Sequence, residues 1–306
     1  MNSIDGRTFA AMIITHGRPD SVETWDTLRR SGYTGRIVIV IDNLDKTADR
    51  YREKFGAENV AVFDKREYMR RFDMYDNFRD VRQACSARNA CFDIAEQLGI
   101  QDFVELDDDY FWFHFRRDAD LNYKYETVRC LDEVFAAFVR FLRSTPVASI
   151  AMAQGGDYIG GKRGRNAGPE LSMTRKCMNS WFCSTDRRIH FHGTMNDDVN
   201  TYVLFTTRGR LFFTNVQCCL LQPQTQAIAG GMTDVYKDSG TYRKTFYTVM
   251  IAPSCSKVSA LRDRTQPRIH HHISWENCAP KVLSESVKGY GSEGVEDKEA
   301  ASTPPV

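Results

Sequence analysis

Short apolar runs alternate with helical patterns through the first half of the chain, and this alternation restricts the fold more than any other feature. Apolar runs typical of buried strands occupy residues 9–15, 37–41, 59–63 and 102–106. Amphipathic helical patterns separate these runs, and glycines such as Gly32 end them. Strands and helices in this order predict an α/β fold with a mostly parallel central sheet and helices on both faces.

The second half of the chain has a less regular pattern. A helical pattern at 126–143 and a strand-like run at 147–152 continue the α/β order, and the glycine-rich, basic segment 155–169 predicts a mobile surface loop. Three further strands are predicted at 199–206, 211–216 and 246–251. The charged and small residues of 284–306 predict a disordered tail, which leaves a single domain over residues 1–283.

Composition and charge exclude several classes of protein. The 306 residues carry a formal net charge of +1, so only local basic groups could attract a nucleic acid. No segment reaches the roughly 18 to 20 apolar residues that cross a membrane, and the N-terminus lacks a signal-peptide pattern. The nine cysteines show no CxxC spacing, which favours reduced, buried thiols over disulfides or a zinc site. We therefore expect a cytoplasmic protein without a membrane partner.

Three adjacent aspartates at the end of the fourth predicted strand are the strongest functional signal. Asp107, Asp108 and Asp109 repel one another unless a cation or several donors neutralise them. All-oxygen ligation suits Mg²⁺ or Mn²⁺, and alternation along a strand sends Asp107 and Asp109 to the same side. We expect Asp109 to be the main metal ligand, and Asp107 to share the metal or to lie near a ribose. A solvated acidic turn is the simpler alternative.

Other candidate binding residues lie near the predicted strand ends. Thr15 and Arg18 flank His16-Gly17 in the turn after the first strand, where a glycine allows close approach and an arginine suits phosphate. Asp42 ends the second strand and could accept a hydrogen bond from a base or ribose. Arg88 precedes the aspartates and offers donors to a phosphate or to the carboxylate cluster. Each could also be an ordinary turn or surface residue.

In this order, the elements resemble a nucleotide-sugar glycosyltransferase of the GT-A type. The similarity covers roughly residues 9–283 and depends on the strand-end residues described above. More narrowly, the segments 196–200 (Asn-Asp-Asp-Val-Asn) and 230–236 (Gly-Gly-Met-Thr-Asp-Val-Tyr) look like the TET-associated glycosyltransferases of bacteriophages, which are relatives of the base J glucosyltransferase.

This resemblance implies a UDP-sugar donor, a divalent metal ion (Mn²⁺ or Mg²⁺) and a 5-hydroxymethylated pyrimidine in DNA as acceptor, above all 5-hydroxymethylcytosine. It also implies a phage protein that acts in the cytoplasm of the bacterial host. Residues 1–150 would form the donor-binding half of the domain, and residues 151–283 the acceptor-side half.

Glycosyl transfer with inversion needs a carboxylate that takes the proton of the acceptor hydroxyl. Asp197 and Asp198 are candidates for this base, and Asp234 competes with them; a turn-capping role is the structural alternative. Lys244 could reach the leaving diphosphate. His272, in a run of three histidines, could add an imidazole to the metal site, since metal ligands often come from distant parts of a chain.

Local basic and aromatic residues give modest support for a DNA acceptor. Basic side chains that could track a phosphate backbone are Lys162, Arg163, Arg165, Arg187, Arg188, Arg262, Arg264 and Arg268. Tyr158, Trp181 and Phe182 could stack on a base that leaves its duplex. Solvated loops explain the same residues more simply.

Three other functions remain open at this level. The donor chemistry could serve a protein, lipid or saccharide acceptor, the acidic cluster could belong to a metal-dependent nuclease, or the chain could be a binding module without catalysis. DNA retention that falls steeply with salt would favour a DNA acceptor. Cleavage of DNA without a nucleotide sugar would favour the nuclease, and activity that survives loss of Asp107 and Asp109 would favour the binding module.

Overall fold

The computed structural model describes residues 2–118, 120, 122–154, 171–175, 177–223, 232–262 and 267–289. Its centre is an 11-stranded sheet in which nine strands follow one path. In spatial order these are β4 (Val60–Phe63), β3 (Arg36–Asp42), β2 (Arg7–Ile14), β5 (Asp102–Asp107), β10 (Ser180–Ser184), β8 (Ser149–Gln154), β11 (Phe212–Leu221), β6 (Trp112–Arg117) and β7 (Tyr123–Thr127). Two short strands, β1 (Ser3–Ile4) and β9 (Leu171–Ser172), pair with β2 and β11.

The direction of the strands confirms the predicted fold class, a mixed α/β fold with a mostly parallel central sheet. The first four strands on the path are parallel, as are β8 and β11. Strand β10 is antiparallel to both of its neighbours, and β6 is antiparallel to β11 and β7. Strands β8, β11 and β7 therefore run in the same direction as the first four.

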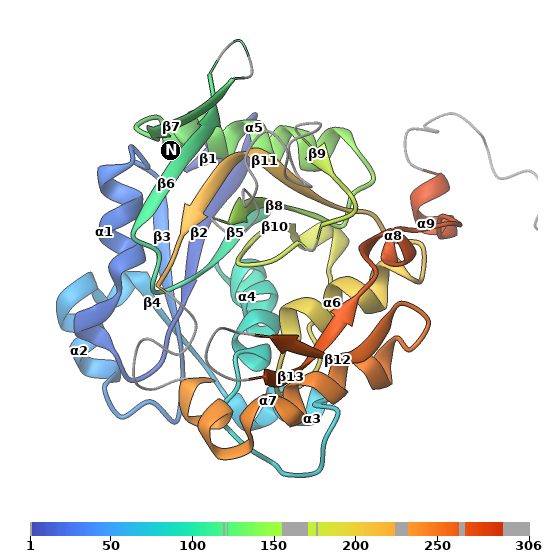
Figure 1. Ribbon diagram of the computed structural model, residues 1–306. Coiled ribbons are helices and arrows are strands. Elements are labelled where there is room, and N and C mark those ends of the chain that lie inside the picture. The colour runs from blue at the N-terminus through green and yellow to red at the C-terminus, as the bar shows by residue number, and fades with distance from the viewer. Residues whose placement is uncertain are drawn as a thin grey trace, which may run out of the picture.

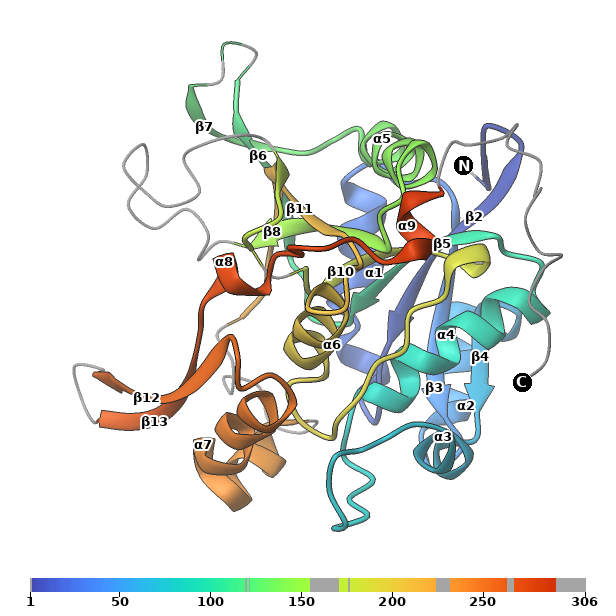
Figure 2. The ribbon, with the colours of Figure 1, turned by 90° about the vertical axis from the view of Figure 1, so that its right-hand side faces the viewer.

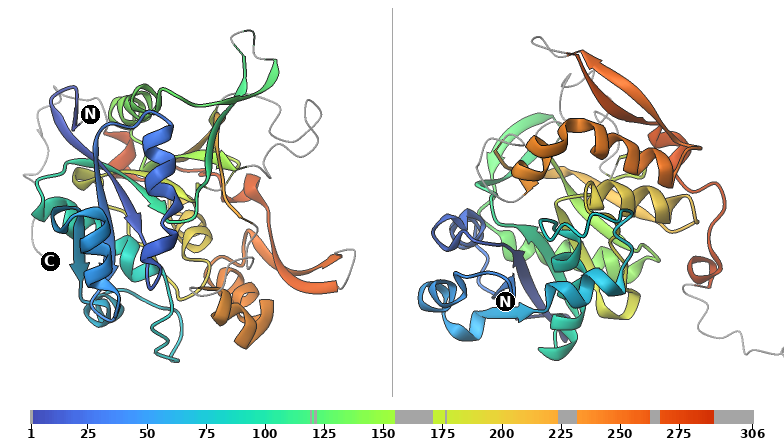
Figure 3. Two further views of the ribbon diagram at one scale, coloured as in Figure 1. Left: turned by 90° about the vertical axis from the view of Figure 1, so that its left-hand side faces the viewer. Right: turned by 90° about the horizontal axis from the view of Figure 1, so that it is seen from below.

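Helices cover both faces of the sheet (Figures 1 and 3). One face carries α1 (Glu23–Arg30), α2 (Ala48–Phe55) and α5 (Leu131–Ser144), and the other carries α3 (Lys65–Arg71), α4 (Cys85–Gln97) and α6 (Asp197–Thr206). Side chains alternate along β2, so that Met12 and Ile14 join the core under α4 while Ala11 and Ile13 join the core under α5. Because both faces of the sheet are buried, strands such as β2 and β3 are continuous apolar runs in the sequence.

A smaller layer lies beside α6 (Figure 2). It consists of α7 (Met232–Ile251) and the hairpin of β12 (Ser256–Arg262) and β13 (Pro267–Ile273), and α7 contacts both α6 and the hairpin. The remaining elements are short: η1 (Pro19–Ser21), η2 (Ala57–Asn59), η5 (Thr185–Arg187), α8 (Trp275–Cys278) and α9 (Glu285–Lys288).

Two of the predicted strands are wrong. Residues 199–206 lie in α6, and residues 246–251 lie in the last part of α7. Their β-branched and aromatic residues suggested strands, but Val199, Tyr202 and Val203 are spaced to lie on one helical face, and that face is buried. The helix predicted at 126–143 begins later, at Leu131, because residues 123–127 form β7.

Other predictions have mixed outcomes. All nine cysteines are free and eight of them are buried, which confirms the reduced thiols. The loop predicted at 155–169 lies outside the described residues. Part of the predicted tail is ordered, since α9 buries Val287, while residues 290–306 are not described. Within the described chain, no helix combines the length and the apolar character that a membrane span requires.

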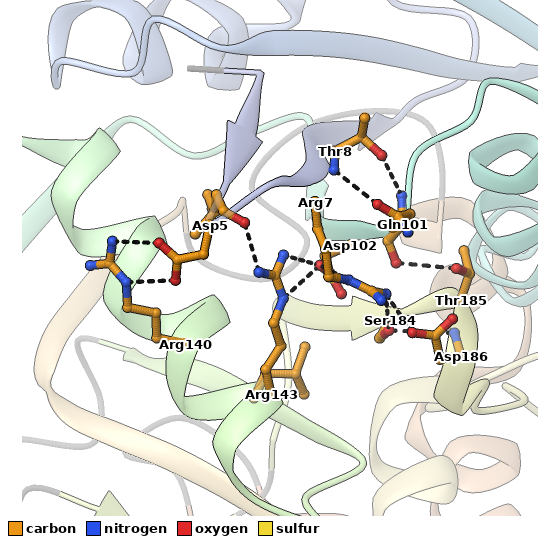
Figure 4. Close-up of polar contacts among 12 residues, drawn as sticks. Asp5, Arg7, Thr8, Gln101, Asp102, Arg140, Arg143, Ser184, Thr185 and Asp186 are labelled. Atoms are coloured by element: carbon orange, nitrogen blue, oxygen red, sulfur yellow. Dashed lines mark hydrogen bonds and ion pairs between the residues drawn. The ribbon is translucent and has the colours of Figure 1, made fainter.

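A buried ion-pair cluster fastens the amino end of the sheet (Figure 4). Asp102, the first residue of β5, is fully buried, and its Oδ2 accepts hydrogen bonds from Arg7 Nε at 3.1 Å and Arg143 Nε at 2.9 Å. Arg143 also donates to the backbone oxygen of Ile4 at 2.7 Å. The cluster therefore joins α5 to β5 and to the β1–β2 hairpin.

Replacing Asp102 with alanine is expected to lower the free energy of unfolding by about 3 kcal/mol, because two arginines lose the carboxylate that neutralises them. The matched control is Arg140→Ala, since Arg140 pairs with Asp5 in the same region but both side chains are exposed. The control should have a much smaller effect. Urea denaturation measures the free energy of unfolding of both variants. An equal loss of stability in the two would contradict the role given to the buried cluster.

Candidate active site

The predicted strand-end residues meet at the carboxyl edge of the sheet, where ligands bind in open α/β sheets. Ile14, at the end of β2, lies opposite Val40 of β3 and Asp107 of β5. The turn after β2, the end of β3 and the aspartates after β5 are therefore neighbours in space. The structure brings together Thr15, Arg18, Asp42, Asp107, Asp108 and Asp109 at this edge.

Asp108 is directed into the turn that follows β2. Its Oδ2 accepts a hydrogen bond from Thr15 Oγ1 at 2.5 Å, and its Oδ1 accepts one from Arg18 Nη2 at 2.8 Å. The hydroxyl of Tyr51, on α2, lies 3.1 Å from Thr15 Oγ1 and accepts from the Arg18 backbone at 2.9 Å. These contacts fix the turn against the aspartates. Sequence reasoning missed Tyr51, since no local motif marks an aromatic residue inside a polar helix.

Asp109 is the least compensated carboxylate of the three. Among the described residues, its buried Oδ1 has no hydrogen-bond partner. Burial, together with the nearby charges of Asp107 and Asp108, raises the pKa of Asp109 to about 7. A buried oxygen without a donor beside a second carboxylate suits a hard cation.

Arg88, on α4, connects the aspartates to α6. Its guanidinium donates to Glu105 Oε1 at 2.5 Å, to Asp107 Oδ1 at 2.9 Å and to Asp197 Oδ2 at 2.7 Å. Burial disfavours its charged form, but the three carboxylates outweigh burial and hold the pKa of Arg88 well above its ordinary value. Of the two roles predicted for Arg88, the structure shows the contact with the carboxylate cluster.

One arginine cannot neutralise three carboxylates, and two of the three have raised pKa values. Burial raises the pKa of Glu105 to about 7 and that of Asp197 to about 6, although Arg88 acts in the opposite direction on both. Glu105 is fully buried inside β5, where an apolar side chain would be expected. Sequence reasoning missed it, although a glutamate inside an apolar strand run was a visible signal.

The start of α6 is held against α7 and the hairpin. Asn196 has a left-handed backbone (φ 56°), and its Nδ2 donates to the backbone oxygen of Lys244 at 2.8 Å and lies 3.4 Å from His271 Nδ1. These contacts hold the residue before α6 against the Lys244 backbone and His271.

Asp234 lies near the start of α7, and its side chain is outside the described part of the structure. The next residue, Val235, is buried against Met195, so the segment approaches the start of α6. Asp198 is partly buried and its charge acts on Asp197.

His272 does not fit the metal set predicted for it. It is exposed on β13, and within the described residues no three His, Cys, Asp or Glu side chains converge as metal ligands. Side chains alternate along a strand, so His271, not His272, shares a face with the buried Ile273 and turns toward Asn196. Strand alternation could have indicated this from the sequence.

Asp42 is buried in a polar cluster. Its carboxylate contacts His16 Nδ1 at 2.8 Å and accepts from Lys65 Nζ at 3.0 Å and from the Leu44 backbone at 3.0 Å. Burial opposes ionisation, but His16 and Lys65 prevail and lower the pKa of Asp42. Asp42 therefore remains ionised at the edge of the site, where Lys65 is a second residue that the sequence did not reveal.

The structure corrects part of the predicted DNA surface. Trp181 and Phe182 are fully buried in β10, so neither can stack on a base. Arg187 donates to the Thr145 backbone at 2.6 Å, and Arg188 pairs with Asp93 and Glu96, so both hold the fold together. The other predicted groups lie outside the described residues or have side chains that are not described: Tyr158, Lys162, Arg163, Arg165, Arg262, Arg264 and Arg268.

This arrangement defines an α/β enzyme whose acidic site lies where parallel strands end. The family model of the TET-Associated Glycosyltransferases matches residues 9–231. The chain belongs to this family and is a glycosyltransferase, which confirms the resemblance inferred from the sequence. A search of the curated proteins found no match.

Comparison with solved structures gave matches of low sequence identity. One is glucosyl-3-phosphoglycerate synthase from Mycobacterium tuberculosis in complex with Mg²⁺ and UDP, with 9% identity, coverage of 88% of each chain and a TM-score of 0.45. Another is S. aureus TarS 1–349 in complex with UDP-GlcNAc, with 11% identity, coverage of 75% of this chain and 63% of the other, and a TM-score of 0.41.

Replacing Arg88 with lysine is expected to lower kcat for glycosyl transfer by about 100-fold, because an ammonium cannot hold three carboxylates in the geometry that a guanidinium imposes. Arg71→Lys is the matched control, since Arg71 is exposed on α3 and pairs with Asp93. Steady-state kinetics, with circular dichroism to confirm folding, measures the effect. A folded Arg88→Lys enzyme with full kcat would show that Arg88 does not position the site.

Proposed function

We propose that this enzyme transfers a sugar from a UDP-sugar to the hydroxyl of a 5-hydroxymethylated pyrimidine, 5-hydroxymethylcytosine, in DNA, and that it uses Mn²⁺ or Mg²⁺. Membership of the TET-associated glycosyltransferases supports this acceptor. The observation that carries the proposal is the uncompensated carboxylate of Asp109 beside Asp107, at the edge of the sheet where a nucleotide would bind.

Asp107 and Asp109 suit a divalent ion. Their carboxylates are close enough for the charge of Asp107 to raise the pKa of Asp109, and Asp109 keeps a free buried oxygen within the described structure. Oxygen ligands from two carboxylates, completed by phosphate oxygens and water, are typical of Mg²⁺ and Mn²⁺ sites. Such an ion would offset the negative charge that develops on the departing diphosphate.

The turn at residues 15–18 is our candidate for contact with the donor. Arg18 Nε is buried and has no acceptor among the described residues, although Arg18 Nη2 is held by Asp108. An unused guanidinium donor in a fixed turn suits a phosphate or ribose oxygen. Thr15, in this turn, and Asp42, which contacts His16 of the turn, are our candidates for contact with a ribose or base. Lys244, from α7, is our candidate for a cation that reaches the diphosphate.

Asp197 is our candidate for the base that deprotonates the acceptor. Arg88 holds one carboxylate oxygen, while burial raises the pKa of Asp197 to about 6, close to neutral pH. A base with a pKa near the working pH combines a large ionised fraction with useful proton affinity. Asp198 and Asp234 remain alternatives in the same region.

The decisive experiment incubates the enzyme with Mn²⁺, a panel of UDP-sugars and an oligonucleotide that contains 5-hydroxymethylcytosine. Nucleoside mass spectrometry should then find a hexose or N-acetylhexosamine mass on the modified base. EDTA and Asp109→Ala should each abolish it, and an oligonucleotide with unmodified cytosine is the matched control. If UDP-sugar is hydrolysed but no modified DNA accepts the sugar, the acceptor is wrong and the glycosyltransferase remains.

The pH dependence of transfer tests the base. At saturating Mn²⁺, which keeps Asp109 ionised, kcat should be constant above neutral pH and should fall below an apparent pKa of about 6 as Asp197 gains a proton, because a base acts only when ionised. Asp197→Asn should lower kcat at neutral pH by about 100-fold to 10,000-fold. Asp198→Asn and Asp234→Asn are the matched variants, and a larger loss in either would move the role to that residue.

A further inference from the structure

A pocket lies between α3, the α3–α4 connection and the segment that precedes α6. Its volume is about 790 Å³, and its lining includes Arg66, Arg70, Phe72, Arg79 and Thr194. We call it the arginine pocket. In Figures 1 and 2 the α3–α4 connection (residues 72–84) lies beside α7, at the carboxyl end of the parallel strands.

Among the described residues, the lining of the arginine pocket contains three arginines and three aspartates, and the difference between them lies in their partners. Arg66, Arg70 and Arg79 are exposed, and none of them forms an ion pair with another described residue. Arg66 and Arg70 are four residues apart on α3, where like charges face each other and destabilise a helix. This arrangement is favourable when an anion bridges the guanidinium groups.

The acidic residues of the arginine pocket are largely engaged elsewhere. Asp80 pairs with Arg82 at 2.9 Å, and Asp76 pairs with Arg243 at 3.3 Å and also contacts the Tyr247 hydroxyl. Asp73 accepts a hydrogen bond from the Tyr75 backbone at 2.8 Å and remains exposed. Among the described residues of the pocket, three unpaired cations therefore face one unpaired carboxylate.

An exposed aromatic ring stands next to the arginine pocket. Phe78, beside Arg79 in sequence, is 67% exposed, and the Arg243 guanidinium lies 4.1 Å from its ring centre. Asp76 holds Arg243 in place. A phenylalanine fixed in this way offers one open face on which a base could stack.

Two backbone hydrogen bonds connect the arginine pocket to the catalytic region. The Gly193 and Thr194 nitrogens donate to the backbone oxygens of Asp73 and Met74, at 2.9 Å and 3.0 Å. Asp197, our candidate base, follows Thr194 by three residues at the start of α6. A DNA strand bound in the arginine pocket would therefore lie close to the segment that leads into α6.

We propose that the arginine pocket and Phe78 bind the DNA strand that carries the acceptor base. Arg66, Arg70 and Arg79 contact successive phosphates, and Phe78 stacks on a base next to the modified one. This inference rests on the proposed DNA acceptor and names the surface that binds it. Phosphate contacts fix the position of the strand without reading its sequence, so sugar transfer should tolerate different flanking bases.

The test compares wild-type enzyme with Arg66→Ala/Arg70→Ala/Arg79→Ala and with Phe78→Ala. The probe is a fluorescein-labelled single-stranded oligonucleotide with one 5-hydroxymethylcytosine, and anisotropy is measured over a range of salt concentrations. The triple variant should bind at least about tenfold more weakly. The negative slope of log K against log salt should become less steep by about 0.7 for each phosphate that the variant no longer neutralises. Phe78→Ala should weaken binding about tenfold with little change in slope.

Arg140→Ala is the matched control, since Arg140 is an exposed arginine at the opposite end of the sheet (Figure 4). It should bind DNA like the wild type. Kinetics give a second readout: the triple variant should raise the KM for DNA but not the KM for the free nucleoside 5-hydroxymethyl-2′-deoxycytidine, which has no phosphate.

The outcomes separate this inference from the proposed function. If the wild type glycosylates DNA and the triple variant keeps the wild-type KM and salt slope, the arginine pocket is not the DNA surface. If the triple variant loses transfer to the nucleoside as strongly as transfer to DNA, its arginines act on the catalytic site and the inference is wrong. If the wild type hydrolyses UDP-sugar but neither binds nor modifies DNA, the proposed acceptor itself has failed.

Discussion

The buried guanidinium of Arg88 is the interaction on which the rest of the site depends. It joins α4 to Glu105 and Asp107 on β5 and to Asp197 on α6, and so connects the two halves of the chain. A neutral side chain in its place would leave three carboxylates facing one another in a poorly solvated region, which is costly. Helix α4, strand β5 and helix α6 are held in one arrangement because each contributes a charged side chain to the same cluster.

The two ends of β5 show how similar chemistry serves stability at one end and function at the other. At the amino end, two arginines surround the single carboxylate of Asp102 (Figure 4). At the carboxyl end, carboxylates outnumber arginines, and the pKa values of Glu105 and Asp109 rise to about 7. Such strongly shifted groups concentrate at functional sites, because a site that binds a cation must leave negative charge for it. The compensated end fastens the sheet, and the uncompensated end is available for chemistry.

Sequence reasoning was accurate where the signal was local and periodic. The first four parallel strands follow from apolar runs, and the position of the aspartates follows from polar residues at the end of β5. It failed in the second half, where residues 199–206 and 246–251 contain strand-forming residues but lie in α6 and α7. Packing on the core and on each other outweighed the local preference of these segments. His272, the histidine chosen as a metal ligand, is exposed on β13, whereas its neighbour His271 approaches Asn196.

The sequence alone determined the order of strands and helices in the first half of the chain, the position of Asp107, Asp108 and Asp109 at a strand end, and the family of the protein. These follow from hydrophobic periodicity and from short motifs, which act over a few residues. Only the tertiary structure decided that Arg88 meets Asp197, that Asp108 supports a turn while Asp109 keeps a free oxygen, and that the α3–α4 connection lies beside α6. Arg88 and Asp197 are 109 positions apart, and contacts over such separations depend on how the packed layers of the fold come together.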